Sequence, residues 1–308
     1  MDKLLVGVSP HIRATCSTRT IMRDVVIALM PALIATILLY GWRALLLTAV
    51  SAAACVLCEY LWEKLLHRPV TIGDLSAVVT GVLLALNVPV SMPIWQLVIG
   101  DMAAILLAKM LFGGLGCNFM NPALVGRIVL TFSFASNITD FSYPDRVADA
   151  LSSATPLGVM DGLDWSYFPD LFLGVHGGVM GETCVLALLL GGIYLVARKV
   201  IKPTIPLCYM GSVALFSWLF GGAQPLLSIF AGGVMLGSIF MATDYVTSPF
   251  TNRGKAIFGI GCGLITAAIR VFGNYAEGVT FSILLMNLLV PYINDLTQTK
   301  PLGGAVEK

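Results

Sequence analysis

Long apolar stretches separated by short polar segments are the feature that most constrains this chain. A helix that crosses the hydrocarbon core of a bilayer needs about 20 mainly apolar residues. Eight stretches approach that length, and two shorter ones join them: 24–40, 43–62, 93–112, 182–197, 204–220, 225–241, 256–272 and 276–292, with 74–88 and 121–135. Only 11% of the residues are charged and 57% are hydrophobic, whereas soluble domains carry about 25% charged residues. We therefore predict an all-α integral membrane protein with about ten transmembrane helices.

The basic residues of the polar segments predict how the chain is oriented. Lys and Arg concentrate on the cytoplasmic side of a membrane protein. With ten spans, one side receives Lys3, Arg13, Arg19, Arg23, Lys64, Arg68, Arg198, Lys199, Lys202, Arg253 and Lys255. The loop at 136–181 instead carries six aspartates and one arginine. We expect both termini in the cytoplasm and this loop outside the cell membrane, with Arg43 as a basic exception on the outer side.

The chain is expected to contain two similar halves. Segments 80–93 and 236–249 are both apolar, have an early glycine, and end in polar residues followed by a proline. Five spans in each half would make the halves inverted repeats, and such repeats bind ligands near the midplane where broken helices meet. We divide the chain into a cytoplasmic segment (1–23), a first membrane repeat (24–135), an extracytoplasmic loop (136–181), a second membrane repeat (182–292) and a cytoplasmic tail (293–308).

A hydroxyl-rich run, Asp149-Ala-Leu-Ser-Ser-Ala-Thr-Pro-Leu157, lies in the acidic loop. Pro156 disfavours helical geometry at the residue before it, and the small side chains of Ser153 and Ala154 leave the Thr155 hydroxyl approachable. Thr155 is therefore a candidate acceptor for a covalent modification. An ordinary turn is the alternative, because Ser, Thr and Pro are common in loops. The residue types alone leave both interpretations open.

A second irregular segment, Gly113–Ala123, combines three glycines with Asn118 and Asn121. Irregular backbone at membrane depth is stable only where protein or a lined cavity satisfies its polar groups. Asn side chains offer both donors and acceptors, which the edge of a flavin ring requires. The alternative is that the two asparagines cap the following helix. Thr243 and Asp244, at the end of another span, are the second candidate for the same cavity.

Ionisable residues inside the spans are candidates for an ion pathway, because charges in a bilayer are costly and are kept for function. Asp101 lies in the predicted span 93–112, two helical turns before Lys109. Asp244 lies at a helix end that is rich in hydroxyl groups. We assign both aspartates to an ion pathway, and their oxygen atoms suit Na⁺ and a proton equally. Glu59 and Glu63 are expected at the inner membrane interface.

Three motifs resemble those of one family of membrane proteins, which comprises RnfD of the Rnf complexes and NqrB of the sodium-pumping NADH:quinone reductase. The run that contains Thr155 is similar to the family's Ser-x-Ala-Thr flavinylation motif. Gly113–Ala123 is similar to its GGLGxNxxNPA signature, and Ala242-Thr243-Asp244 to its ATDPV motif, in which Tyr245 here replaces the proline. The opening Ser9-Pro10-His11 also matches the family, and the shorter N-terminal region favours the RnfD branch.

The resemblance implies an electron-carrying subunit of an ion-translocating ferredoxin:NAD⁺ oxidoreductase that is not catalytic alone. It implies FMN linked to Thr155 through a phosphoester bond and a second, noncovalent flavin, riboflavin, near Asn118 and Asn121. A threonine hydroxyl is a weak nucleophile without a nearby base, so a separate flavin transferase is expected. The implied partners are Rnf subunits A, B, C, E and G and membrane lipid, in the cytoplasmic (inner) membrane of a bacterium or archaeon, with no nucleic acid.

Two other functional classes stay open at this stage. Inverted repeats with broken helices are also typical of solute channels and transporters, which would hold no redox cofactor. A passive scaffold that anchors redox partners is the third class. It differs from the preferred interpretation in predicting that electron flow survives the loss of the Thr155 hydroxyl.

Overall fold

The computed structural model describes residues 17–140, 165, 168–221, 225–273 and 278–298, and the regular elements in these ranges are helices. They are α1 (Thr18–Tyr40), α2 (Trp42–Leu65), η1 (Ile72–Asp74), α3 (Ser76–Leu86), α4 (Ile94–Ala103), η2 (Ala104–Met110), α5 (Pro122–Ser133), α6 (Ala135–Ile138), α7 (Phe168–Leu173), α8 (Val185–Ala197), α9 (Thr204–Leu219), α10 (Leu227–Phe230), α11 (Val234–Leu236), η5 (Gly237–Met241), α12 (Asn252–Phe272) and α13 (Val279–Thr297). The predicted all-α class is confirmed for these residues.

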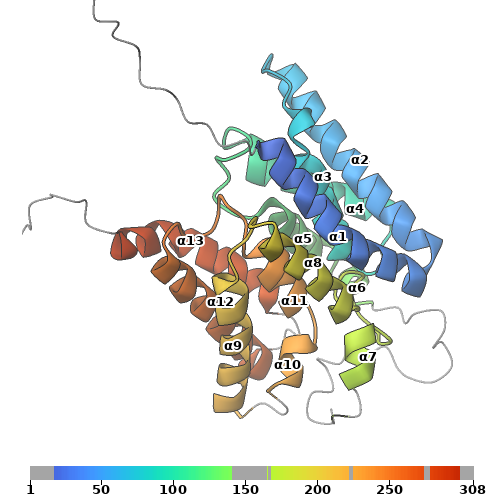
Figure 1. Cartoon of the computed structure of the whole chain (residues 1–308). Coiled ribbons are helices and arrows are strands. Elements are labelled where there is room, and N and C mark those ends of the chain that lie inside the picture. Colours follow the sequence, from blue (N-terminus) through green and yellow to red (C-terminus); the bar gives the residue numbers. More distant parts are fainter. Residues whose placement is uncertain (1–16, 141–164, 166–167, 222–224, 274–277, 299–308) are drawn as a thin grey trace, which may run out of the picture.

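The helices gather in two groups that follow the order of the chain (Figure 1). In the first group α2 packs against α3 and α4, and in the second α12 packs against α9 and α13. Helices α1 and α8, which open the two groups, pack against each other. The groups therefore meet along a central seam, and the inverted relation between them stays a prediction.

Four helices are long and apolar enough to cross a bilayer: α1, α2, α12 and α13. Four others, α3, α5, α8 and α9, are apolar but have only 10 to 17 residues. Each of the ten predicted apolar segments contains helix, and 225–241 is divided among α10, α11 and η5. The chain is a multi-pass membrane protein, and the count of ten crossings stays a prediction.

Helix α2 has the reverse polarity pattern of a helix in a soluble protein, because its buried face contains polar residues and its exposed face is apolar. Its buried side chains include Ser51, Glu59 and Glu63, whereas Leu57 and Leu61 are more than half exposed. Large apolar surface on a soluble monomer is unfavourable, but lipid chains cover it without penalty. The pattern on α2 is therefore what a helix requires when its outer face contacts lipid and its inner face contacts protein.

The exceptional basic residue Arg43 has a structural reason for its position. Its guanidinium group donates to the carbonyl oxygen of Val90 at 2.8 Å and to that of Ser91 at 3.1 Å. These carbonyls belong to the turn between α3 and α4, where no helix satisfies them. Arg43 thus closes the turn, which accounts for a positive charge where the loop bias does not favour one.

Candidate functional site

A pocket of about 790 Å³, its open mouth included, lies on the seam between the two groups of helices. The first group contributes Ser76, Lys109, Asn118 and Asn121 to its wall, and the second contributes Thr243 and Asp244. The apolar part of the wall includes Val25, Leu83, Leu195 and Phe240. The structure therefore brings four of the predicted site residues, Asn118, Asn121, Thr243 and Asp244, to one cavity.

The glycines of segment 113–123 allow the chain to turn back after η2. Gly113, Gly114 and Gly116 have φ angles of 121°, 99° and 89°, a region that residues with a Cβ atom rarely adopt. The backbone N–H of Gly114 donates to the carbonyl of Lys109 at 3.0 Å, which closes the end of η2. This turn places Asn118 in the wall of the pocket.

Asn121 ties the two groups of helices together. Its Oδ1 accepts a hydrogen bond from the N–H of Ala123 at 3.0 Å, so it caps α5. Its Nδ2 donates to the carbonyl oxygen of Met241, at the end of η5, at 3.1 Å. The capping alternative thus holds for Asn121. Asn118 does not cap α5; its Nδ2 donates to the carbonyl of Met120 at 3.2 Å.

Thr243 and Asp244 follow η5 on the opposite wall. The Thr243 hydroxyl donates to the carbonyl of Ile239 at 2.6 Å, and Asp244 accepts from the Thr247 hydroxyl at 3.0 Å. Burial raises the pKa of the Asp244 carboxyl, and hydrogen bonds from Thr247 and Asn118 partly oppose this. Tyr245, at the position of the family's proline, donates from its phenolic hydroxyl to the carbonyl of Val200.

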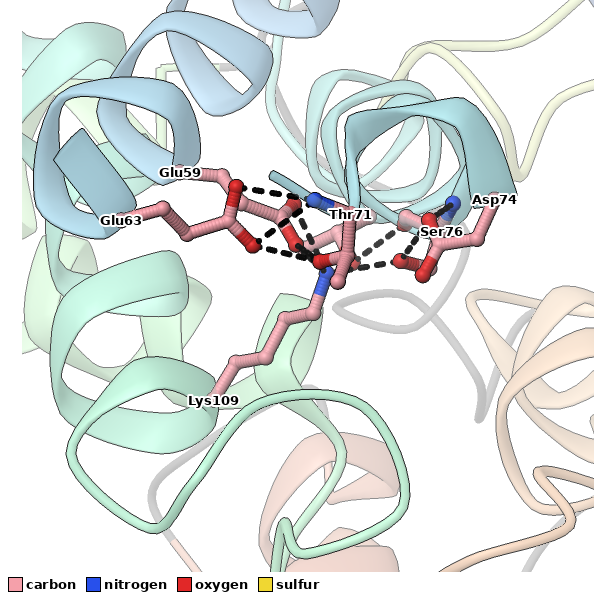
Figure 2. A network of polar contacts seen from close by, with 7 residues as sticks. Glu59, Glu63, Thr71, Asp74, Ser76 and Lys109 are labelled. Carbon is pink, nitrogen blue, oxygen red and sulfur yellow. Dashed lines mark hydrogen bonds and ion pairs between the residues drawn. The ribbon is translucent and has the colours of Figure 1, made fainter. Parts of the chain in front are cut away.

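A buried ion pair lies at one end of the pocket. The ammonium group of Lys109 contacts both carboxylate oxygens of Glu59 at 2.8 Å and donates to the Ser76 hydroxyl at 2.7 Å. Figure 2 shows these side chains with Glu63, Thr71 and Asp74, which extend the network along the 66–75 segment. Lys109 and Glu59 are 2% and 0% exposed, so neither charge is solvated by bulk water.

Asp101 lies outside the pocket, in α4. Its Oδ1 accepts hydrogen bonds from the Ser51 hydroxyl at 2.5 Å and from the Cys55 thiol at 3.4 Å. The side chain is completely buried. The two aspartates that we assigned to an ion pathway therefore occupy separate places, Asp244 in the pocket wall and Asp101 between α2 and α4.

The polar network of Glu59 and Glu63 was not predicted from the sequence. Their exposed fractions are 0% and 2% because the 66–75 segment folds over them, and their position at the membrane interface stays a prediction. The sequence does contain a signal, because Ser51, Cys55, Glu59 and Glu63 are four residues apart, which places them on one face of a helix. Lys109, for which no role was predicted, is the partner of Glu59.

A second buried ion pair joins α5 to the segment before α8. Arg127 lies 3.5 Å from Glu182, and its guanidinium also donates to the side-chain oxygen of Asn87 at 2.7 Å. Both charged side chains are nearly inaccessible to solvent. This pair crosses the seam and contributes to its cohesion.

The candidate flavinylation residues, Ser153, Ala154 and Thr155, lie outside the described residues. The structure therefore places the pocket, the Lys109 network and Asp101, and the covalent linkage stays a prediction from the motif.

Comparison with known proteins places these features in a family. The family model of the NQR2, RnfD, RnfE family matches residues 5–303. The chain is also similar to the D subunits of several ion-translocating complexes. That of the Na⁺-translocating ferredoxin:NAD⁺ oxidoreductase complex of Acetobacterium woodii is 45% identical over 305 residues, which cover 97% of this chain and 95% of that protein.

Two further relatives are more distant but are matched over most of their length. The corresponding protein of the proton-translocating ferredoxin:NAD⁺ oxidoreductase complex of Clostridium ljungdahlii is 39% identical, with 97% of this chain and 96% of that protein covered. The one from an ion-translocating oxidoreductase complex of Escherichia coli O6:H1 is 33% identical, with 97% and 98% covered. The similarity therefore extends over the whole membrane domain.

Proposed function

The chain belongs to the NQR2, RnfD, RnfE family, and on that premise we propose that it is the electron-carrying RnfD component of an ion-translocating ferredoxin:NAD⁺ oxidoreductase complex. The observation that supports a redox role most directly is the seam pocket. Asn118 and Asp244 come from segments more than a hundred residues apart and line one cavity. A subunit that only anchored its partners would have no need of such a cavity.

The walls of the pocket fit the noncovalent flavin that we propose there. Small-molecule pockets are mostly apolar with a few placed polar groups, and this one has the same composition. Val25, Leu83 and Phe240 offer an apolar surface, and the Asn118 side chain offers an amide in the same lining. Asn121 shapes the pocket, because both its Oδ1 and its Nδ2 already bond to backbone.

A bound flavin would supply electron transfer in steps of one or two electrons, and the protein would set its position and electrostatics. Lys109 is the residue suited to setting the electrostatics of the flavin. Its ammonium group lines the pocket and is held by Glu59 and Ser76, so its charge is fixed in place. A fixed positive charge beside a flavin favours the reduced, more negative ring.

We further propose that Thr155 carries FMN through a phosphoester bond on the outer side of the cytoplasmic membrane. The motif around Thr155 supports this, and a flavin transferase would attach the group. Rnf subunits A, B, C, E and G would deliver and remove electrons. Asp101 and Asp244 would belong to the pathway of the coupled ion, Na⁺ or H⁺, in a chain of two inverted five-helix repeats with both termini in the cytoplasm.

In-gel ultraviolet fluorescence of the denatured chain tests the covalent flavin. The chain is produced in a host that contains the transferase, as wild type, Thr155→Ala and the matched control Thr139→Ala. We expect a fluorescent band in the wild type and the control and none in Thr155→Ala. A wild type without a band, and without flavin released on extraction, would favour a channel or transporter.

Extraction of the folded protein tests the second flavin. Asn118→Ala should lower the riboflavin recovered per mole of chain and leave the in-gel band unchanged. Thr247→Ala, which removes a hydrogen bond to Asp244 behind the wall, should lower recovery less. Equal recovery from the wild type and Asn118→Ala would remove Asn118 from the site.

A further inference from the structure

A row of buried polar side chains runs along one face of α2. Ser51, Cys55, Glu59 and Glu63 follow each other at intervals of four residues, and their exposed fractions are 0%, 0%, 0% and 2%. Successive members are about 6 Å apart along the helix axis, a gap that one water molecule can bridge. Polar and ionisable groups inside a membrane domain are costly and commonly mark proton relays.

The two ends of the row differ. At one end Glu63 accepts hydrogen bonds from the backbone N–H and the hydroxyl of Thr71, which is exposed. At the other end the row meets Asp101, whose Oδ1 accepts from Ser51 and Cys55. Asp101 Oδ2 is buried and has no hydrogen-bond partner among the described residues. The row thus runs from an exposed surface toward a carboxyl oxygen that has no partner among the described residues.

We propose that this row is a proton path between the surface at Thr71 and the carboxyl group of Asp101. A proton from water is taken up by the Glu63 carboxylate and passes along the row to Asp101 Oδ2, which converts the Asp101 carboxylate to a carboxylic acid. Release to a later acceptor restores the carboxylate. The proposal rests on the proposed redox-driven translocation, because it assigns this path to the ion that the complex moves.

Lys109 is the reason to assign the path to a proton rather than to Na⁺. Its ammonium group already occupies the cation position at Glu59 in the middle of the row, because it contacts both carboxylate oxygens, which are therefore not free to coordinate Na⁺. A proton is exchanged between bonded groups and does not have to pass the ammonium group. Lys109 also lines the seam pocket, so a change of charge in the pocket is felt at Glu59.

Covalent labelling by dicyclohexylcarbodiimide tests the path without reference to flavin. This apolar reagent adds to a protonated carboxyl group: the acid proton moves to a carbodiimide nitrogen, the carboxyl oxygen bonds to the central carbon, and rearrangement leaves a stable N-acylurea. We expect the adduct mass on the Asp101 peptide of the purified complex. Asp24 is an internal control, because it is also buried but its carboxylate pairs with Arg198 at 3.2 Å.

Asp101 should be labelled at least about ten times more than Asp24, since the Arg198 guanidinium pairs with the Asp24 carboxylate, whereas Asp101 Oδ2 has no partner among the described residues. Asp101→Asn should abolish the adduct. Ser51→Ala, which removes a hydrogen bond that stabilises the carboxylate, should raise labelling at least about twofold. An unlabelled Asp101, or equal labelling of the two aspartates, would overturn the proposal.

Proton uptake by proteoliposomes tests the path in function. The complex is assembled with wild type, Asp101→Asn, Glu63→Gln or the control Asp24→Asn, and NADH formation from reduced ferredoxin is followed together with a trapped pH dye. With an uncoupler present we expect NADH formation in all four. Without the uncoupler, protons moved per NADH should fall at least about tenfold in Asp101→Asn and Glu63→Gln and stay unchanged in Asp24→Asn.

If Asp101→Asn moves as many protons per NADH as the wild type, the proposed path is wrong. The path is also wrong if Asp101→Asn loses Na⁺ uptake and keeps proton uptake. If Asp101→Asn does not assemble, Ser51→Ala must still change the rate of proton uptake, and an unchanged rate counts against the proposal. In-gel flavin fluorescence of the same samples tests the proposed redox function separately, because a wild type without a fluorescent band would indicate a failure of that function and not of the proton path.

Discussion

The ammonium nitrogen of Lys109 lies 2.8 Å from both carboxylate oxygens of Glu59, and both side chains are almost completely buried. The two residues are 50 positions apart in the chain. Their pairing fixes η2 against the C-terminal half of α2 and holds a positive charge at the wall of the seam pocket.

Breaking this pair on one side should destabilise the protein more than removing it whole. Lys109→Met leaves the Glu59 carboxylate buried without its counter-charge, which typically costs about 3 to 5 kcal/mol. The double variant Glu59→Gln with Lys109→Met leaves no charge behind and should recover more than half of the loss. Thermal unfolding of the detergent-solubilised chain measures both, and additive losses would contradict the pairing.

Substitution of Asn121 should destabilise the protein more than substitution of Asn118. Asn121→Ala removes a helix cap, worth about 0.5 to 2 kcal/mol, and a hydrogen bond across the seam, worth about 0.5 to 1.5 kcal/mol. Asn118→Ala removes a local bond to Met120 and a bond to Asp244 but no helix cap, and it should change the unfolding midpoint less. Parallel melting curves separate them, and a larger shift for Asn118 would be the contrary result.

The glycine turn offers a test of backbone strain without steric conflict. A Cβ atom at Gly114 meets nothing within 4 Å, but the residue has a φ of 99°. Gly114→Ala should therefore lower stability by about 1 to 2 kcal/mol through conformation alone. Gly73, which also has open space and no positive φ, is the matched control, and Gly73→Ala should be close to neutral. Similar shifts for both would show that the turn is not strained.

Stability should fall in mild acid because of His176, which lies in the segment between α7 and α8. Burial lowers the pKa of its imidazole below the usual 6.5. The unfolded chain therefore binds a proton near pH 6.5 while the folded chain does not, so stability is complete above that pH and decreases below it. His176→Gln should flatten the dependence between pH 7 and 5, as urea or thermal unfolding at several pH values would reveal. An unaltered slope would mean that other groups cause it.

Hydropathy was sufficient to predict the helices, because an apolar run of bilayer length has few other stable structures. The segments 74–88 and 121–135 were correctly recognised as short, and they became α3 and α5. The site was only partly predictable. The motifs around Asn118 and Asp244 suggested one cavity, whereas the Glu59–Lys109 pair depends on how η2 packs against α2 and leaves no local pattern.

The different structural roles of Asn118 and Asn121 also could not be predicted from their spacing in the sequence. Asn121 directly precedes Pro122, the first residue of α5, so the sequence indicates its role as a cap but not its second partner. Only the position of Met241, which arrives from the other half of the chain, decides that Asn121 binds across the seam. Tertiary contacts of this kind set the role of a residue whose local sequence allows two.

The buried polar face of α2 constrains how the chain inserts into the membrane during synthesis. Glu59 emerges from the ribosome long before Lys109 is synthesised, and an unpaired charge in lipid raises the insertion free energy by up to about 3 kcal/mol. We therefore expect the last turns of α2 to remain near the membrane surface until α4 and η2 supply the counter-charge. Truncation before Lys109 should then leave α2 poorly inserted and open to degradation.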